Sequence, residues 1–243
     1  MNILLLEAFE VDARLPRKDR RWSHVKKILK KQPGDRLAAG LADGPLGEAV
    51  IRELDSTGIV LGFEPLGDAP PLAPIRLILG FPRPIQAARI LRDLTTLGVS
   101  EILLTGTDLG EPSYAQSRFF RDGDFRGHLM EGAEQAGNPR LPRVSIHRDL
   151  ERCLETLAEK GMGPGQGERI LLHPYGDPEP MGGARFRSPI TLAVGSERGW
   201  SEPELAAFLH AGFSVKGLGG RILKTETAAL ASCVLALAGL GLI

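Results

Sequence analysis

Hydrophobic and polar positions divide the chain into two parts with different patterns. Before residue 65, short apolar runs are separated by turn sequences such as Asp43-Gly44, which predicts strands at 37–39, 48–53 and 58–64. A helix is predicted ahead of them at 20–31, closed by a Gln-Pro-Gly-Asp turn. Residues 65–74 contain four prolines and are predicted to form a linker.

After residue 74, buried apolar runs alternate with helical patterns. The predicted strands are 75–80, 100–105, 143–146, 169–173, 190–194 and 213–215. The predicted helices are 85–97, 119–136, 149–160 and 201–211, followed by an apolar helix that runs almost to the last residue. Ser201 and Glu204 have the spacing of a capping box. This alternation predicts an α/β fold with a mainly parallel sheet covered by helices on both faces.

Loops that carry Gly or Pro follow three of these strands. His173-Pro174 follows the first, Gly195 the second and Leu218-Gly219-Gly220 the third. Ligands bind outside the carboxyl ends of parallel strands, and the last loop leads into a helix whose first N–H groups lack intrahelical partners. The loops are interpreted as one pocket built largely of main chain; ordinary strand-to-helix turns are the alternative.

The net charge is zero, but its distribution is uneven. Nine Lys and Arg residues lie between positions 14 and 31 against one acid, Asp19. Such a block can attract phosphates, and Trp22 and His24 inside it could stack on bases. A solvated helix face is the alternative interpretation.

The sequence lacks the motifs that are typical of several classes of protein. Cys153 and Cys233 are predicted to be buried thiols in a reducing compartment, and no Cys/His spacing suggests a metal. The glycine-rich run 161–167 follows a helix and precedes a strand, which favours a connector over a nucleotide loop. No Walker phosphate loop or serine-hydrolase elbow occurs. With neither a signal-peptide pattern nor a membrane span, a cytoplasmic protein is expected.

Two late motifs resemble those of a known family. Residues 194–204 (VGSERGWSEPE) resemble I-G-P-E-G-G-F-S-x-x-E, and residues 218–228 (LGGRILKTETA) resemble L-G-x-R-I-L-R-x-E-T-A. Both patterns belong to the RsmE family of 16S ribosomal RNA uridine-N3 methyltransferases, in the SPOUT class of knotted methyltransferases. Weaker agreement extends over 24–30 (HVKKILK), 97–99 (LGV) and 133–142 (AEQAGNPRLP), so the resemblance covers nearly the whole chain in order.

The resemblance implies two domains and a cofactor. Residues 1–70 would form a PUA-like β-barrel that grips RNA, and residues 71–243 a SPOUT methyltransferase domain with a trefoil knot at about 170–243. The knot would bind S-adenosylmethionine, and two subunits would pair as a homodimer. The substrate would be ribosomal RNA or the small ribosomal subunit.

Site residues carry over from the matched motifs. The cofactor would be bound by Leu172, His173, Pro174, Gly195, Ser196, Glu197, Gly199, Leu218, Gly219, Ile222 and Leu223. Arg221 would stabilise negative charge on the base, with Glu197 or Glu226 as proton acceptor. RNA would be bound by Arg20, Arg21, His24, Lys26, Lys27, Lys30, Arg83, Gln135 and Arg140. The chain departs from the family pattern at Ser196, Arg198, Arg83, Thr96, Asn138 and Asp108-Leu109-Gly110.

Two other functions remain open from the sequence. A non-catalytic or differently targeted RNA-binding protein with the same fold is suggested by Arg198 and Asn138, which replace a glycine and an arginine. A dinucleotide-dependent oxidoreductase is suggested by the α/β pattern and the loop at 218–220. The latter ranks lower, because no acidic residue lies about 20 positions after a proper glycine fingerprint.

Overall fold

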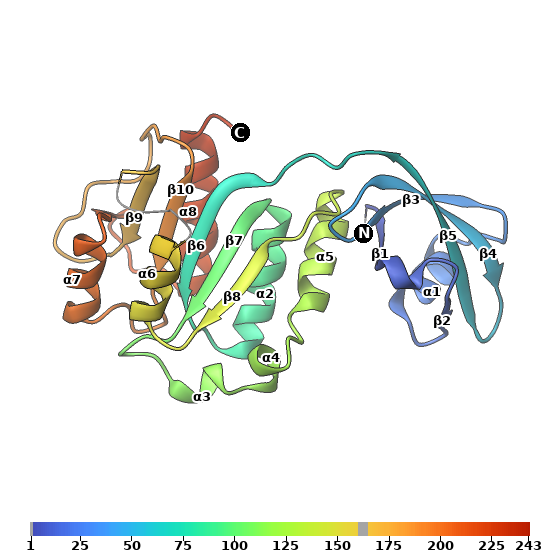
Figure 1. Cartoon of the computed structure of the whole chain (residues 1–243), viewed down its shortest axis with the longest axis horizontal. Helices are drawn as coiled ribbons and strands as arrows, with labels where there is room; N and C mark the ends of the chain where they lie inside the picture. Colours follow the sequence, from blue (N-terminus) through green and yellow to red (C-terminus); the bar gives the residue numbers. More distant parts are fainter. Residues whose placement is uncertain (1, 160–164) are drawn as a thin grey trace. The chain divides into compact units, whose positions relative to one another are not determined.

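The chain folds into two compact units, each with its own sheet (Figure 1). The structure is a computed structural model that describes residues 2–159 and 165–243, so most of the predicted connector at 161–167 lies outside the described residues. The N-terminal unit comprises Met1–Pro71 and Met130–Leu141, and the C-terminal unit comprises Leu72–Leu129 and Pro142–Ile243. Residues 130–141, which the resemblance assigns to the second domain, belong to the N-terminal unit.

The N-terminal unit contains a curled five-stranded sheet in the order β1-β3-β4-β5-β2. Its strands are β1 (Leu4–Leu6), β2 (Arg14–Pro16), β3 (Arg36–Leu41), β4 (Leu46–Leu54) and β5 (Gly58–Gly67). β1 pairs with β3 in parallel, and the other pairs are antiparallel. β1 and β2 were not predicted; each has only three residues, too few for a periodicity to show.

The helix predicted at 20–31 is shorter and less regular than expected. It consists of α1 (Arg20–Ser23) and one π-helical turn, η2 (His24–Ile28). Asp19 caps the start by accepting a hydrogen bond from the Arg21 N–H. Lys30 has φ 54°, in the left-handed region that cannot continue a right-handed helix. The prediction that the helix reaches Lys31 was therefore wrong.

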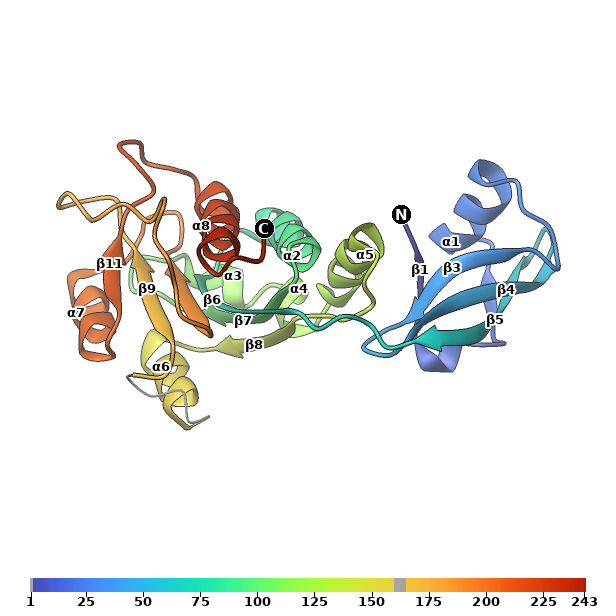
Figure 2. The ribbon, with the colours of Figure 1, turned by 90° about the horizontal axis from the view of Figure 1, so that it is seen from above.

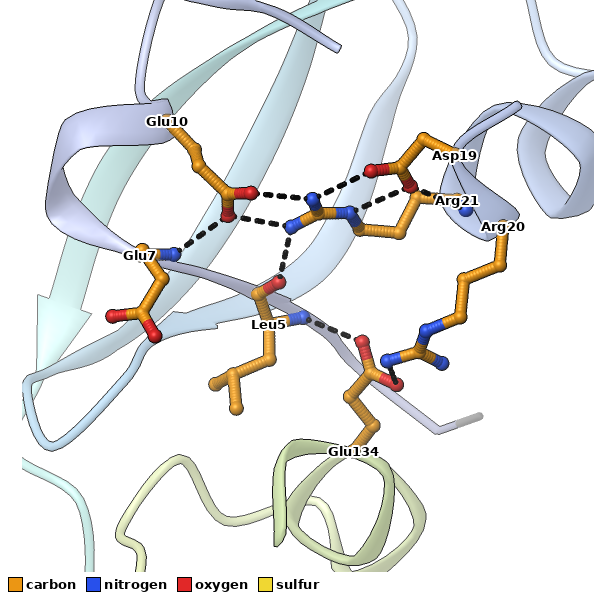
Figure 3. Close-up of polar contacts among 7 residues, drawn as sticks. All are labelled: Leu5, Glu7, Glu10, Asp19, Arg20, Arg21 and Glu134. Carbon is orange, nitrogen blue, oxygen red and sulfur yellow. Dashed lines mark hydrogen bonds and ion pairs between the residues drawn. The ribbon is translucent and has the colours of Figure 1, made fainter. Parts of the chain in front are cut away.

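Buried ionic contacts hold this unit together (Figure 3). The guanidinium of Arg21 binds the carboxylates of Glu10 and Asp19, at 2.6 and 2.8 Å, and donates to the Leu5 carbonyl at 3.0 Å. The Glu134 carboxylate accepts from the Leu5 N–H at 3.2 Å and pairs with Arg20 at 2.5 Å. Glu134 thus fastens the second half of α5 (Arg126–Ala136) to β1.

Replacing Glu134 with glutamine should change how stability depends on pH. Burial raises the pKa of the Glu134 carboxyl above its ordinary value of 4.5, although Arg20 opposes the shift. The folded chain therefore holds this proton more tightly than the unfolded chain does. The stabilisation that the protonated Glu134 carboxyl gives the folded state is complete below about pH 4.5 and is lost as pH rises through the raised pKa.

Thermal unfolding of both proteins between pH 4.5 and 7 measures this effect. We expect the melting temperature of the wild type, relative to Glu134→Gln, to fall as pH rises. A difference that stayed constant or grew with pH would contradict the assignment.

The C-terminal unit is built on a six-stranded, wholly parallel sheet in the order β11-β9-β10-β6-β7-β8. Its strands are β6 (Ala73–Gly80), β7 (Val99–Thr105), β8 (Arg143–His147), β9 (Glu168–Leu172), β10 (Ile190–Val194) and β11 (Ser214–Lys216). The predicted parallel sheet is confirmed. The linker predicted at 65–74 is shorter than expected, because its first residues belong to β5 and its last residues to β6. Only residues 68–72 lie between the two strands.

Helices cover both faces of this sheet, as Figure 2 shows. On one face, α2 (Pro84–Thr96) and α8 (Thr225–Gly239) pack together, and α8 also contacts β6 and β10. On the other, α6 (Leu150–Glu159) and α7 (Glu202–His210) share a core with Ile78, Leu103 and Leu171. The Ser201–Glu204 capping box and the burial of Cys153 and Cys233 are confirmed.

The helix predicted at 119–136 is interrupted. α4 (Arg118–Arg121) ends before Gly123, which has φ 75°, and α5 begins at Arg126. A further four-residue helix, α3 (Pro112–Ala115), precedes α4. No helix in residues 2–159 and 165–243 combines the length and apolarity needed to cross a bilayer.

Candidate functional site

The carboxyl ends of β9, β10 and β11 lie at one edge of the sheet, side by side. β9 pairs in parallel with β10 on one flank and with β11 on the other. The loops that begin at His173, Gly195 and Gly217 therefore leave from the same edge. The strand ends thus lie together as the sequence predicted, and one pocket formed by the three loops stays a prediction.

The loop after β10 closes on itself as a tight main-chain turn. The Gly199 N–H donates to the Ser196 carbonyl at 2.9 Å. A Cβ on Gly195 would lie 2.8 Å from the Gly199 main chain, closer than real Cβ contacts come. Residues 195–199 therefore form a cradle of main-chain groups in which no side chain fits at Gly195.

Two neighbouring strand ends support this cradle. The end of β6 touches it, because a Cβ on Gly80 would lie 2.5 Å from the Ser196 main-chain nitrogen. After β7, the Thr107 hydroxyl donates to the buried Ser196 hydroxyl at 3.2 Å. Ser196, which replaces the family proline, thus uses its hydroxyl to bind the adjacent loop.

The segment after β11 runs beside a distant part of the chain. Gly217 donates to the Glu179 carbonyl and accepts from the Met181 N–H, both at 2.9 Å. Further along, the Phe186 N–H donates to the carbonyl of Gly239 near the end of α8. In the described chain, the main-chain N–H groups of residues 219–222 donate no hydrogen bond. They remain available to a ligand at the edge from which the 195–199 loop also leaves.

The predicted cofactor residues differ in exposure. Leu172 is buried as the last residue of β9, whereas Pro174 and Ile222 are exposed. The ring of His173 packs edge-on against Tyr175, with centroids 5.4 Å apart. Leu218 and Leu223 are half-buried. The edge therefore offers apolar surface next to main-chain donors.

The loops and helix ends that follow these strands also carry charged side chains. The Glu197 carboxylate accepts from the Arg83 N–H at 3.1 Å, and the Arg83 Nε–H donates to the Tyr114 hydroxyl at 2.8 Å. Arg221 is exposed, and Glu226 lies in the first turn of α8. Sequence reasoning missed Tyr114, Thr107 and Gly80, because their roles depend on contacts between loops far apart in the chain.

A cavity of about 970 Å³ lies at the ends of β6, β7 and β8. Phe81, Leu150 and Leu154 give it apolar surface. Its charged lining comprises one arginine, Arg148, and the carboxylates of Asp108, Glu111, Asp149, Glu151, Glu155 and Glu204. This excess of negative charge disfavours the binding of a phosphate group in the cavity.

The residues predicted to bind RNA in the N-terminal unit have different surroundings. Arg21 is only 6% exposed and bound by two carboxylates, which gives it a structural role in place of the predicted RNA contact. Arg20 is occupied by Glu134, and Arg140 Nε donates to the Ala69 carbonyl at 3.1 Å. Lys26, Lys27, Lys30 and Gln135 are exposed, and His24 is half-buried.

Asn138, where the family has an arginine, also has a structural role. Its side-chain amide donates to the Pro70 carbonyl at 3.1 Å and accepts from the Arg140 N–H at 3.1 Å. The first of these bonds connects the segment after α5 to residues 68–72, which join β5 to β6. The substitution therefore does not itself indicate a loss of function.

Comparison with known proteins adds independent findings. A family model described as an RNA methyltransferase domain matches residues 69–237. A Treponema pallidum protein named ribosomal RNA small subunit methyltransferase E is 38% identical over 98% of this chain and 91% of its own length. A Borreliella burgdorferi protein named ribosomal RNA small subunit methyltransferase E 1 is 28% identical over 97% of each chain.

A solved structure supports the same fold. The Neisseria gonorrhoeae ribosomal RNA small subunit methyltransferase E, crystallised with S-adenosyl methionine, superposes with a TM-score of 0.73. The alignment covers 98% of this chain and 97% of the other, at 22% identity.

Proposed function

Because this chain belongs to the RNA methyltransferase family, together with relatives named ribosomal RNA small subunit methyltransferase E, we propose that it methylates N3 of a uridine in 16S ribosomal RNA. The methyl donor is S-adenosylmethionine. The observation that carries the proposal is the set of loops at one edge of the sheet: the 195–199 main-chain turn follows β10, and the loop after β11, whose N–H groups at 219–222 donate no hydrogen bond in the described chain, leaves from the same edge. Such an enzyme acts in the cytoplasm, where its ribosomal substrate is made.

The residues at this edge fit S-adenosylmethionine. Glycine at position 195 lets the loop fold tightly against Gly199, so residues 195–199 present mainly main-chain groups at this edge. Main-chain N–H groups suit ring nitrogens and the carboxylate of the donor, and Leu172, Leu218 and Leu223 offer apolar walls. Ser196 and Gly199 shape the cradle, and Gly219 and Ile222 belong to the loop that follows β11 at the same edge of the sheet.

The chemistry assigned to the donor is simple. When bound, S-adenosylmethionine supplies an electrophilic methyl group that passes to N3, while sulfur keeps the electron pair of the broken bond. The chain's residues must position the uridine and favour its deprotonated ring. We assign charge stabilisation to the Arg221 guanidinium and acceptance of the N3 proton to Glu197 or Glu226.

The contacts of Gly217 and of Phe186 with Gly239 support a trefoil knot at the C-terminus. They bring β11, its following loop and the end of α8 against the 173–189 segment, as threading of that segment would require. We also propose a homodimer. Exposed apolar side chains on and around α8 would be covered by a second copy: Ile222, Val234, Leu242 and Ile243.

The N-terminal unit, with its curled sheet, is proposed to be PUA-like and to help bind the RNA. At the C-terminal unit, Arg83 is proposed to contact RNA. Its Nε–H is held by Tyr114, which leaves the two terminal amino groups of the guanidinium for a phosphate.

Replacing Tyr114 with phenylalanine should weaken RNA binding through Arg83. A lost hydrogen bond of this kind costs about 1 kcal/mol, or roughly a 5-fold higher KM for RNA. Steady-state kinetics should show unchanged kcat, and calorimetry should show unchanged affinity for S-adenosylmethionine. In a protein that already carries Arg83→Gln, adding Tyr114→Phe should not raise the KM for RNA further. A further rise in KM would show that Tyr114 does not act through Arg83.

Mapping of ribosomal RNA modifications tests the proposed function. A strain that lacks this gene should lose one N3-methyluridine from 16S RNA, and the wild-type gene should restore it. An unchanged map, together with no heat on titrating the purified protein with S-adenosylmethionine, would favour a non-catalytic RNA-binding protein.

A further inference from the structure

The basic block at residues 14–31 divides into two sets. The first set is neutralised: Arg14 pairs with Glu53 and Asp55, Arg20 with Glu134, and Arg21 with Glu10 and Asp19. The side chains of the second set form no ion pair in the described part of the chain: Arg17, Lys18, Lys26, Lys27, Lys30 and Lys31. Within the block, only the second set therefore carries positive charge that no carboxylate in the described chain balances.

Three members of the second set gather around one aromatic ring, that of Trp22. Arg17 Cζ lies 5.5 Å from the ring centroid, and Lys26 Nζ and Lys27 Nζ each lie 5.7 Å from it. We call Arg17, Lys26 and Lys27 the Trp22 cation cluster. Attraction to the ring's negative face offsets part of the repulsion among three like charges.

Trp22 is held firmly in the core of the N-terminal unit. Its ring is 5% exposed and packs with Leu4, Leu15 and Val25. Its Nε1–H donates to the Asp55 carbonyl at 3.0 Å, which fixes the ring plane. Stacking of Trp22 on a base, one of the hypotheses from the sequence, would require the ring to leave this core.

We propose that the Trp22 cation cluster binds the phosphodiester backbone of RNA and does not read its bases. The proposal rests on the proposed function, which supplies RNA as the substrate. Three cations without an ion pair in the described chain gather at one ring and can each contact a phosphate, and the ring itself is not accessible for stacking. Trp22 acts as a positioning residue.

Salt dependence of RNA binding tests the proposal. Each phosphate contact to a single strand contributes about 0.7 to the slope of log K against log salt. The triple variant Arg17→Gln, Lys26→Gln, Lys27→Gln should therefore have a slope shallower by about 2. The loss should be equal for two single-stranded RNAs of the same length and different sequence.

A matched control removes equal charge from the same unit. Arg14→Gln, Arg36→Gln and Arg52→Gln together replace three exposed arginines that are already paired with carboxylates. This control should keep the wild-type slope. An unchanged slope in the cluster variant, an equal loss in the control, or a loss for one RNA sequence only would overturn the proposal.

Two further measurements separate the alternatives. Anionic phospholipid vesicles should bind the wild type and the cluster variant equally tightly. If the vesicles bound the wild type more tightly, while the salt slope of RNA binding was the same for both proteins, the cluster would be a membrane-binding site and the proposal would be overturned. S-adenosylmethionine should bind the cluster variant as it binds the wild type. Absence of donor binding in the wild type would count against the proposed function, while the RNA slope would still report on the cluster.

Discussion

Replacing Arg221 with alanine should lower kcat for methyl transfer by about 100-fold or more, the usual cost of removing a group that stabilises transition-state charge. Arg221 is exposed on the loop between β11 and α8 and forms no ion pair in the described chain. Its loss therefore breaks no contact that supports the fold. We expect the melting temperature and the affinity for S-adenosylmethionine to remain close to the wild-type values.

Two variants sharpen this test. Arg221→Lys keeps the charge but not the planar fork, so it should recover part of the activity. Arg198→Ala removes another exposed arginine, from the 195–199 loop, and should lower kcat far less than Arg221→Ala does, because the proposed mechanism assigns charge stabilisation on the base to Arg221 and not to Arg198. Near-normal turnover by Arg221→Ala would remove Arg221 from the mechanism.

Replacing Gly80 with alanine should weaken binding of S-adenosylmethionine by about 10-fold, the equivalent of roughly 1.4 kcal/mol. The new Cβ would lie 2.5 Å from the Ser196 nitrogen and 2.9 Å from the Thr107 methyl group. The Ser196 nitrogen is main chain and cannot rotate away, so the 195–199 cradle must shift. Overpacking of this kind typically costs about 1–3 kcal/mol, so the melting temperature should also fall.

Gly182→Ala is the matched control for Gly80→Ala. Gly182 lies in the 173–189 segment, and a Cβ there would meet no atom within 4 Å. Calorimetric titration should give the control the wild-type affinity. Equal affinities for Gly80→Ala and the wild type would mean that the cradle does not form the donor site.

The sequence was informative where a pattern is local. Buried runs between helical patterns predicted the parallel sheet, and the Ser201–Glu204 spacing predicted the cap of α7. Both depend on residues within one element or on strands long enough to show burial. Gly and Pro after β9, β10 and β11 likewise marked the edge at which these strands end.

Other features depend on contacts that a local pattern does not contain. The left-handed Lys30 ended a helix whose composition favoured continuation. Arg21, one of several similar cations, is buried because Glu10 and Asp19 converge on it from separate segments. The Tyr114–Arg83 bond joins residues 31 positions apart, through a helix of four residues. Such roles emerge only when the tertiary structure is known.

The most direct test of the account is a transfer assay with purified protein. S-adenosylmethionine labelled on its methyl group is incubated with the protein and 16S ribosomal RNA from the deletion strain, and the RNA is digested to nucleosides. We predict label in a single product, N3-methyluridine, at the position that is unmethylated in that strain. Unlabelled RNA, or label in any other nucleoside, would contradict the account.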